Sequence, residues 1–109
     1  MMKRGEIYTF VGKGDFSSKP RPGLIVQSDL FNDYHPSVSV CPITSSLTGD
    51  HLFRILIHRA EGNGLEADSE IEIDKLQSVR MTKVGQFVGA LSGEELDIVD
   101  EALRLWLDL

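Results

Sequence analysis

The hydrophobic pattern of this chain changes its period near Ser92, and this change constrains the fold more than any other feature. Before Ser92, apolar residues occur in short, often alternating runs separated by glycine, proline and aspartate, which is typical of β-strands joined by turns. After Ser92, apolar residues recur at the spacing of an α-helix. Strands at short spacing followed by one helix predict a mainly β domain with a C-terminal helix, built as a small barrel or a strongly bent sheet.

Six segments are predicted to be strands, because they are rich in β-branched and aromatic residues or alternate apolar with polar positions. They are Glu6 to Val11, Pro22 to Ser28, Ser37 to Cys41, Leu52 to His58, Ser69 to Asp74 and Val84 to Leu91. Pro42 is expected to follow its strand, because proline donates no hydrogen bond to a sheet. Gly85 and Gly89 indicate bends or bulges in the last strand.

Two connections and the helix complete the predicted order. The polar stretch from Gly12 to Pro20 is expected to be a mobile loop. Residues 29–36 are expected to form a connection outside the sheet that contains one helical turn. Ser92 and Glu95 have the spacing of a capping box. The apolar residues that follow fall within an arc about 200° wide at helical spacing. Packing on the sheet explains part of that arc, and a partner subunit is one explanation for the remainder.

Length and composition narrow the class of protein. With 109 residues, the chain is expected to form one domain over residues 1–109. No apolar run approaches the ~20 residues that cross a bilayer, and no apolar leader follows Arg4, so we expect a cytoplasmic protein without a membrane segment. The single cysteine, Cys41, has no zinc-ligand neighbours at the usual spacing, and we expect it to be a small buried side chain. We expect neither a metal nor another cofactor.

The charges are distributed unevenly along the chain. The formal net charge is −6, yet the segment up to Pro22 is basic and the segment from Glu61 onward is strongly acidic. One explanation is random variation over a solvated surface. The other is a local cationic site on an acidic body, which would bind a polyanion at one place only.

Arg21 and the pair Thr44 and Ser45 are the candidate chemical groups, because both lie where a predicted strand meets a loop. Prolines on both sides of Arg21 restrict its backbone, and a rigidly held guanidinium suits a phosphate. Simpler roles exist for both: Arg21 as a surface ion-pair partner, and the two hydroxyls as turn formers. The sequence contains no nucleophile elbow, phosphate-binding loop or zinc-protease motif.

Five short blocks, taken together, resemble the MazF/PemK/Kid toxins. These blocks are Arg4-Gly5-Glu6-Ile7-Tyr8, Arg21-Pro22-Gly23-Leu24-Ile25-Val26, Pro42-Ile43-Thr44-Ser45, Leu65-x-x-Asp68-Ser69-x-Ile71 and Gly89-Ala90-Leu91. The resemblance implies an SH3-like β-barrel of the MazF/CcdB type and a homodimeric endoribonuclease. It further implies cleavage of single-stranded RNA such as mRNA at short motifs without a metal, a 2′,3′-cyclic phosphate product with a 5′-hydroxyl, and neutralisation by a cognate antitoxin.

The resemblance also implies roles for individual residues. Arg21 and Thr44 match the family's catalytic arginine and threonine, with Ser45 assisting. Asp74 lies where some members carry a catalytic carboxylate, but Glu72 replaces the arginine that accompanies it there, so a solvated strand-end acid is the alternative. His35 is a further candidate for the base.

RNA binding is predicted for four residues, Lys13, Phe16, Lys19 and Arg80. An aromatic ring between two cations suits a base stacked beside its phosphates, although Phe16 could equally anchor its loop. The loop before Arg21 is shorter than the usual family loop, so no RNA motif is carried over.

Two other functions remain open from the sequence. A toxin of the same broad fold that resembles CcdB would bind and poison DNA gyrase, but that activity is associated with a Trp-Gly-Ile ending, which this chain lacks. The other alternative is an inactive member that keeps only dimerisation and antitoxin binding.

Overall fold

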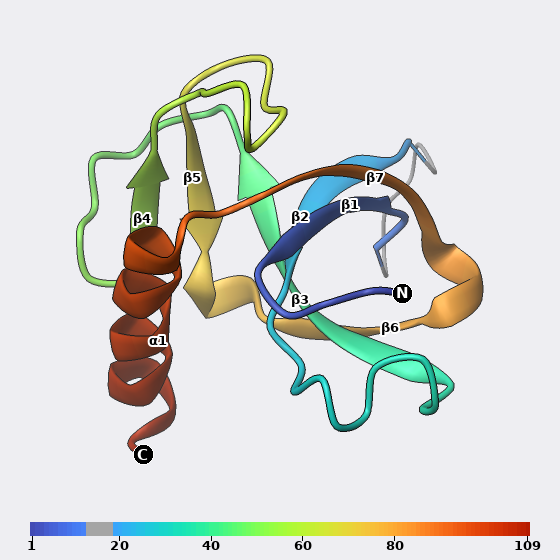
Figure 1. Ribbon diagram of the computed structural model, residues 1–109. Coiled ribbons are helices and arrows are strands. Elements are labelled where there is room, and N and C mark those ends of the chain that lie inside the picture. The colour runs from blue at the N-terminus through green and yellow to red at the C-terminus, as the bar shows by residue number, and fades with distance from the viewer. Residues whose placement is uncertain (13–18) are drawn as a thin grey trace.

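One antiparallel sheet and one C-terminal helix make up this computed structural model, which describes residues 1–12 and 19–109 (Figure 1). Within those residues the sheet has seven strands. They are β1 (Glu6–Phe10), β2 (Arg21–Ile25), β3 (Ser37–Thr44), β4 (Arg54–Ile57), β5 (Ser69–Glu72), β6 (Gln77–Arg80) and β7 (Val84–Ala90). Two 3-10 turns, η1 (Ile73–Lys75) and η2 (Met81–Lys83), precede the helix α1 (Gly93–Leu107). The predicted class, mainly β with a C-terminal helix, is confirmed.

The sheet bends because β3 changes partners along its length. The hydrogen-bonded order is β4-β5-β3-β2-β1-β7, with β6 pairing to β3 outside this path. On one side of β3, residues 37–40 pair with β6 and residues 43–44 pair with β5, while β2 runs along the other side. β4 and β7 are the ends of the path. The bend brings β7 round toward the connection between β4 and β5.

The position of Pro42 differs from the prediction. β3 continues through Pro42 to Thr44 instead of ending at Cys41. Pro42 lies between the part of β3 that pairs with β6 and the part that pairs with β5, and its Cα partner on the other side is Gly23. A proline is tolerated here because the strand changes partners at this residue.

Two apolar clusters lie on opposite faces of the sheet. Leu24 belongs to the cluster covered by the helix, and the next residue, Ile25, belongs to the cluster with Phe10 and Val38. Both are almost fully buried, so this strand is buried on both faces. Cys41 is also buried, as expected, and burial raises the pKa of its thiol to about 12, so it is no nucleophile at neutral pH.

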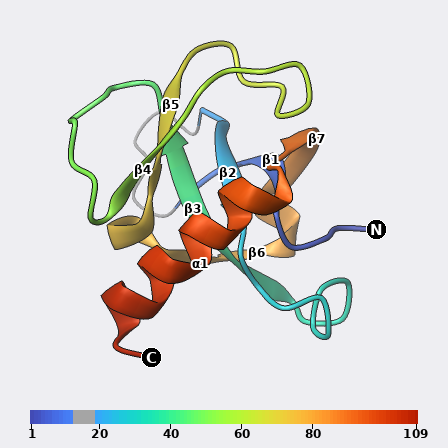
Figure 2. The same ribbon diagram turned by 60° about the vertical axis from the view of Figure 1, so that its left-hand side comes forward.

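The helix covers the β4–β5 end of the sheet (Figures 1 and 2). It begins with the predicted capping box: the Ser92 hydroxyl accepts from the N–H of Glu95, and the Glu95 carboxylate accepts from the N–H of Ser92. Only part of the wide apolar arc is used for packing, with Val99, Ala102 and Leu103 buried. Five large apolar side chains of this terminal segment remain at least 46% exposed: Ile98, Leu105, Trp106, Leu107 and Leu109.

The remaining differences lie at strand ends and in one missed strand. β2 ends at Ile25, β4 begins at Arg54, and β5 ends at Glu72, where the chain enters η1. The segment Gln77–Arg80 is a strand that the sequence did not predict, because Val79 alone is apolar and no alternation is visible. Residues 29–36 form turns and bends without an assigned helix. The predicted irregularity of the last strand is confirmed by register shifts between β1 and β7.

Candidate functional site

A cleft of about 630 Å³ joins the two candidate segments of the sequence. This cavity is called the cleft below. Its lining comprises residues 19–22, at and before the start of β2, and residues 43–45 at the end of β3. Residues 64–67 of the β4–β5 connection, Ser69 at the start of β5, Thr9 of β1 and Val88 of β7 complete the lining. Arg21, Thr44 and Ser45 therefore share one cavity, whose volume is within the range of small-ligand sites.

The sheet register explains why Arg21 and Thr44 meet. β2 and β3 are antiparallel, with Gly23 paired to Pro42 and Leu24 paired to Cys41. Continuing that register by two residues brings Arg21, the first residue of β2, level with Thr44, the last residue of β3. Directly opposed residues of an antiparallel pair project to the same face of a sheet.

The hydroxyl of Thr44 has a fixed local partner. Its Oγ1 accepts a hydrogen bond of 3.1 Å from the backbone N–H of Ser46, so the turn-forming role left open by the sequence is present. A hydroxyl that already accepts one bond still has its own proton to donate. Thr44 is half-buried and Ser45 is exposed, so a ligand in the cleft can reach both.

Buried Glu70 holds the chain that follows Ser46. Its carboxylate accepts from the Thr48 N–H at 3.0 Å, the Thr48 hydroxyl at 2.9 Å and the Gly49 N–H at 3.0 Å. Burial by itself raises the pKa of Glu70, but these hydrogen bonds and the charge of Arg54 outweigh it and lower the pKa below its ordinary value. Since Glu70 is also the β-sheet partner of Thr44, it fixes both ends of the turn after β3.

A buried asparagine fixes the loop that contributes residues 64–67 to the cleft. The Asn63 side-chain oxygen accepts from the N–H groups of Ala60 and Leu65, and its amide donates to the His58 carbonyl at 2.9 Å. Asn63 is 3% exposed. One side chain therefore satisfies three backbone groups and gives the loop beside the cleft a defined shape.

Glycines let this loop lie directly against β7. Gly64 has a φ of +67°, and a Cβ there would overlap the carbonyl oxygen of Val88. Gly89 makes the reciprocal approach, because its Cβ would overlap the backbone of Asn63, and the Ala90 N–H donates to the Gly62 carbonyl at 3.0 Å. The close contact needs glycine at both positions.

Three described residues of the lining carry charge: Lys19, Arg21 and Glu66. The two cations line the same cleft as the Thr44 and Ser45 hydroxyls, an arrangement that suits a phosphate group. Glu66, in the β4–β5 connection, was not predicted from the sequence. The block Leu65-x-x-Asp68-Ser69-x-Ile71 runs through this segment, but Glu66 occupies one of its unmatched positions.

Asp74 is placed away from the cleft, in an ion pair with Arg54. The Arg54 Nε and Nη2 atoms donate to the two Asp74 oxygens at 2.8 and 3.1 Å, and Nη1 lies 3.0 Å from Glu72. The cation beside Asp74 thus comes from the neighbouring strand β4. The Asp74 side chain is 19% exposed, so this carboxylate is mostly buried and paired instead of freely solvated.

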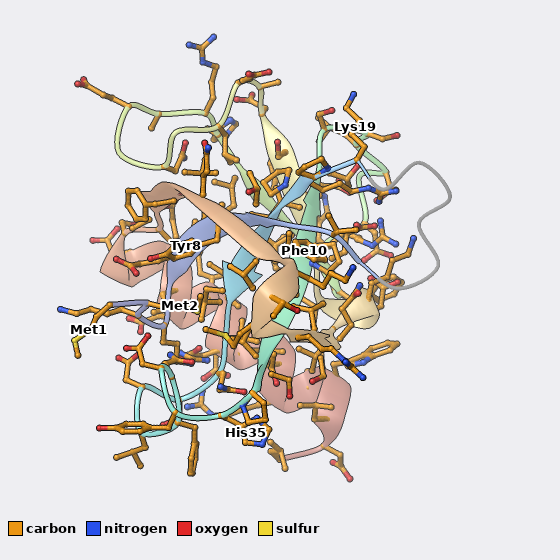
Figure 3. The ribbon with its side chains drawn as sticks, turned by 90° about the vertical axis from the view of Figure 1, so that its right-hand side faces the viewer. Met1, Met2, Tyr8, Phe10, Lys19 and His35 are labelled. Carbon is orange, nitrogen blue, oxygen red and sulfur yellow. The ribbon has the colours of Figure 1, made fainter. Side chains whose placement is uncertain are left out.

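The other predicted residues are not brought together. Arg80 is exposed at the end of β6 and does not line the cleft. His35 lies at the opposite end of the molecule from Lys19 (Figure 3). Lys13 and Phe16, together with most of the loop expected to be mobile, lie outside the described residues.

The Asp74–Arg54 pair predicts a pH-dependent stability. The hydrogen bond from Arg54 lowers the pKa of Asp74 below its ordinary value. A lowered carboxyl pKa stabilises the fold above the unfolded-state value of about 3.9, and this contribution is lost as the pH falls through the folded-state value. We expect Asp74→Asn to lower the free energy of unfolding by about 1–2 kcal/mol at pH 7 and by less at pH 3, measured by urea denaturation.

The matched control for this prediction is Glu101→Gln, which removes an exposed ion pair with Arg104. We expect that variant to change stability by less than about 0.5 kcal/mol at either pH. An Asp74→Asn effect that is equal at pH 7 and pH 3 would contradict the prediction.

Neither a metal cluster nor a membrane helix is found within the described part of the chain. In residues 1–12 and 19–109, no three histidine, cysteine, aspartate or glutamate side chains are grouped so that they could hold a metal ion. The helix in the same residues is neither long nor apolar enough to span a membrane.

Comparison with solved structures shows the fold. The chain superimposes on "Mycobacterium tuberculosis toxin MazF-mt6" with a TM-score of 0.81 at 24% identity, covering 95% of this chain and 97% of that one. An endoribonuclease in complex with its cognate antitoxin, from Mycobacterial species, gives a TM-score of 0.80 at 17% identity, covering 100% and 97%. At these identities the likeness concerns the fold alone.

Sequence comparison shows the family. The probable endoribonuclease MazF of Mycolicibacterium smegmatis is 39% identical over 108 residues, covering 99% of this chain and 98% of the relative. Endoribonuclease MazF9 of Mycobacterium tuberculosis is 30% identical over 117 residues, covering 100% and 98%. Residues 3–107 match the model of the "PemK-like, MazF-like toxin of type II toxin-antitoxin system". Since this match spans nearly the whole chain, the protein belongs to the PemK-like, MazF-like toxins of type II toxin–antitoxin systems.

Proposed function

We propose that this protein is an endoribonuclease toxin that cleaves single-stranded RNA in the cleft. The observation that carries the proposal is the meeting of Arg21, Thr44 and Ser45 in one cavity beside Lys19. A guanidinium, an ammonium and two hydroxyls supply charge and hydrogen-bond donors to one phosphate. Relatives that match the chain over almost its full length are named endoribonucleases, which supports the same activity.

The proposed reaction is an internal attack within the RNA. The 2′-oxygen of one ribose forms a bond to the adjacent phosphorus, and the bond from phosphorus to the 5′-oxygen of the next nucleotide breaks. The 2′-hydroxyl gives up its proton to a base and the departing 5′-oxygen takes one up, leaving a 2′,3′-cyclic phosphate and a 5′-hydroxyl. Negative charge builds on the nonbridging oxygens during the attack, and fixed donors aimed at that charge lower the barrier most.

Arg21 stabilises that charge in the proposed mechanism, because a guanidinium presents two parallel donors and retains its proton. Thr44 donates its hydroxyl proton to a phosphate oxygen while Ser46 holds its oxygen in place. Ser45 supplies a second hydroxyl from the exposed turn. Asp74, engaged with Arg54 outside the cleft, has no part in this step.

The partners proposed are a second copy of the chain and a cognate antitoxin, in the cytoplasm. The exposed apolar side chains at the end of α1 are consistent with a homodimer, because they exceed what the helix needs to pack on the sheet. An acidic antitoxin segment would compete with RNA for Lys19 and Arg21.

The alternative function, poisoning of DNA gyrase, has no support from the relatives described above.

The proposal is tested by incubating the purified protein with a long mixed-sequence RNA in EDTA and mapping the new ends. We expect cuts at a short motif that leave 5′-hydroxyl and 2′,3′-cyclic phosphate ends. Thr44→Val is expected to lower the cleavage rate about 10- to 100-fold, since it loses a hydrogen bond to a charged group, while Thr44→Ser retains most activity. RNA that stays intact with the wild-type protein would refute the proposed function.

A further inference from the structure

Glu66 is an acidic side chain in a cleft otherwise suited to phosphate. It lines the cleft, is exposed, and forms no hydrogen bond or ion pair with any residue that the structure describes. Its backbone is fixed on both sides: the Leu65 N–H donates to Asn63 at 3.0 Å, and the Ser69 hydroxyl donates to the Ala67 carbonyl at 2.9 Å. The backbone that carries Glu66 is therefore held in place, and its carboxylate is available to accept hydrogen bonds from a ligand in the cleft.

The charge of Glu66 limits what it can contact in a bound RNA. An ionised carboxylate only accepts hydrogen bonds, and it repels phosphate, which the cations Lys19 and Arg21 of the same cleft attract. The part of the nucleotide that faces Glu66 must therefore carry N–H or O–H donors. We propose, on the basis of the proposed function, that Glu66 selects a guanine base next to the cleaved phosphate.

Guanine is favoured by the arrangement of donors on the bases. Its Watson–Crick edge carries two adjacent donors, N1–H and the N2 amino group, which match the two oxygens of one carboxylate. The same edges of adenine, cytosine and uracil each place an acceptor beside the donor. One carboxylate oxygen would accept a hydrogen bond from that donor, and the other would be repelled by the neighbouring acceptor. Single-stranded RNA exposes these edges to side chains. Glu66 thus provides sequence preference, while Lys19 and Arg21 bind any phosphate.

The test compares the cut sites of the wild-type protein, Glu66→Gln and Glu61→Gln on the same long RNA. Glu61 is an exposed acid of the same β4–β5 connection that does not line the cleft, so its substitution removes the same charge elsewhere. We expect a guanine at one constant position beside the wild-type cuts. Glu66→Gln should reduce the preference for guanine over the other bases at that position at least tenfold, and Glu61→Gln should leave it unchanged.

A substrate change provides a second, independent measurement. Inosine lacks the N2 amino group of guanine, so replacing that guanine by inosine in a short substrate should slow cleavage by the wild-type protein and have little effect on cleavage by Glu66→Gln.

Wild-type cuts without a preferred guanine, or an unchanged preference in Glu66→Gln, would overturn this inference and leave the proposed function standing. An equal slowing of Glu66→Gln on all sequences with an altered pH profile would also overturn it, assigning Glu66 to the 2′-hydroxyl. A wild-type protein that cuts no RNA would overturn both.

Discussion

Arg21→Ala is expected to lower the rate of RNA cleavage by about 100- to 1,000-fold while leaving the fold intact. Arg21 is exposed at the start of β2, so its loss opens no cavity in either apolar cluster. Removing one preorganised donor to developing negative charge typically costs a factor of this size. Single-turnover cleavage of a mapped substrate measures the effect, and thermal unfolding checks that the variant is folded.

Two further variants sharpen that experiment. Arg21→Lys keeps the charge but loses the planar pair of donors, and we expect a rate between those of the wild type and the alanine variant. Arg59→Ala removes an exposed arginine that does not line the cleft and should cut like the wild type. If Arg21→Ala cut as fast as Arg59→Ala, the guanidinium would have no role in the reaction.

Gly64→Ala is expected to be the most destabilising small substitution near the cleft, lowering the free energy of unfolding by about 3 kcal/mol. One part of the cost is the φ of +67°, which a residue with a Cβ adopts only with strain. The larger part is the overlap of the new methyl group with the Val88 carbonyl, because backbone on both sides has to move apart. Urea denaturation measures the difference, which corresponds to a melting temperature lower by about 15 °C.

Other glycines of the same chain separate the two contributions. Gly49 has a φ of +78° but open space around its Cβ position, so Gly49→Ala reports the backbone strain alone, about 1 kcal/mol. Gly62 has neither a positive φ nor a close neighbour, and its alanine variant should be nearly neutral. Equal losses for Gly64→Ala and Gly49→Ala would show that the loop does not depend on close contact with β7.

The candidate site could be predicted only in part from the sequence. Arg21 and Thr44 were candidates from the sequence because each lies where a predicted strand meets a loop, with prolines around the arginine and hydroxyls after an apolar run. Their expected roles came from the family resemblance. Asp74 was chosen by its place in a motif, and its partner Arg54 could not be predicted because the two are joined only by the pairing of β4 with β5. Glu66 escaped notice because an isolated acid in a loop has no periodicity or spacing.

Local patterns in the sequence by themselves determined most element types: six of the seven strands of the described residues and the capped helix follow from propensity and period, which act over a few residues. The tertiary structure alone decided which loops meet. The register of β2 against β3 set Arg21 level with Thr44, and the packing of the Gly64 loop on β7 brought Glu66 to the same cleft. These contacts join residues far apart in the chain, and they form only when the bend of the sheet and the burial of both apolar clusters are satisfied together.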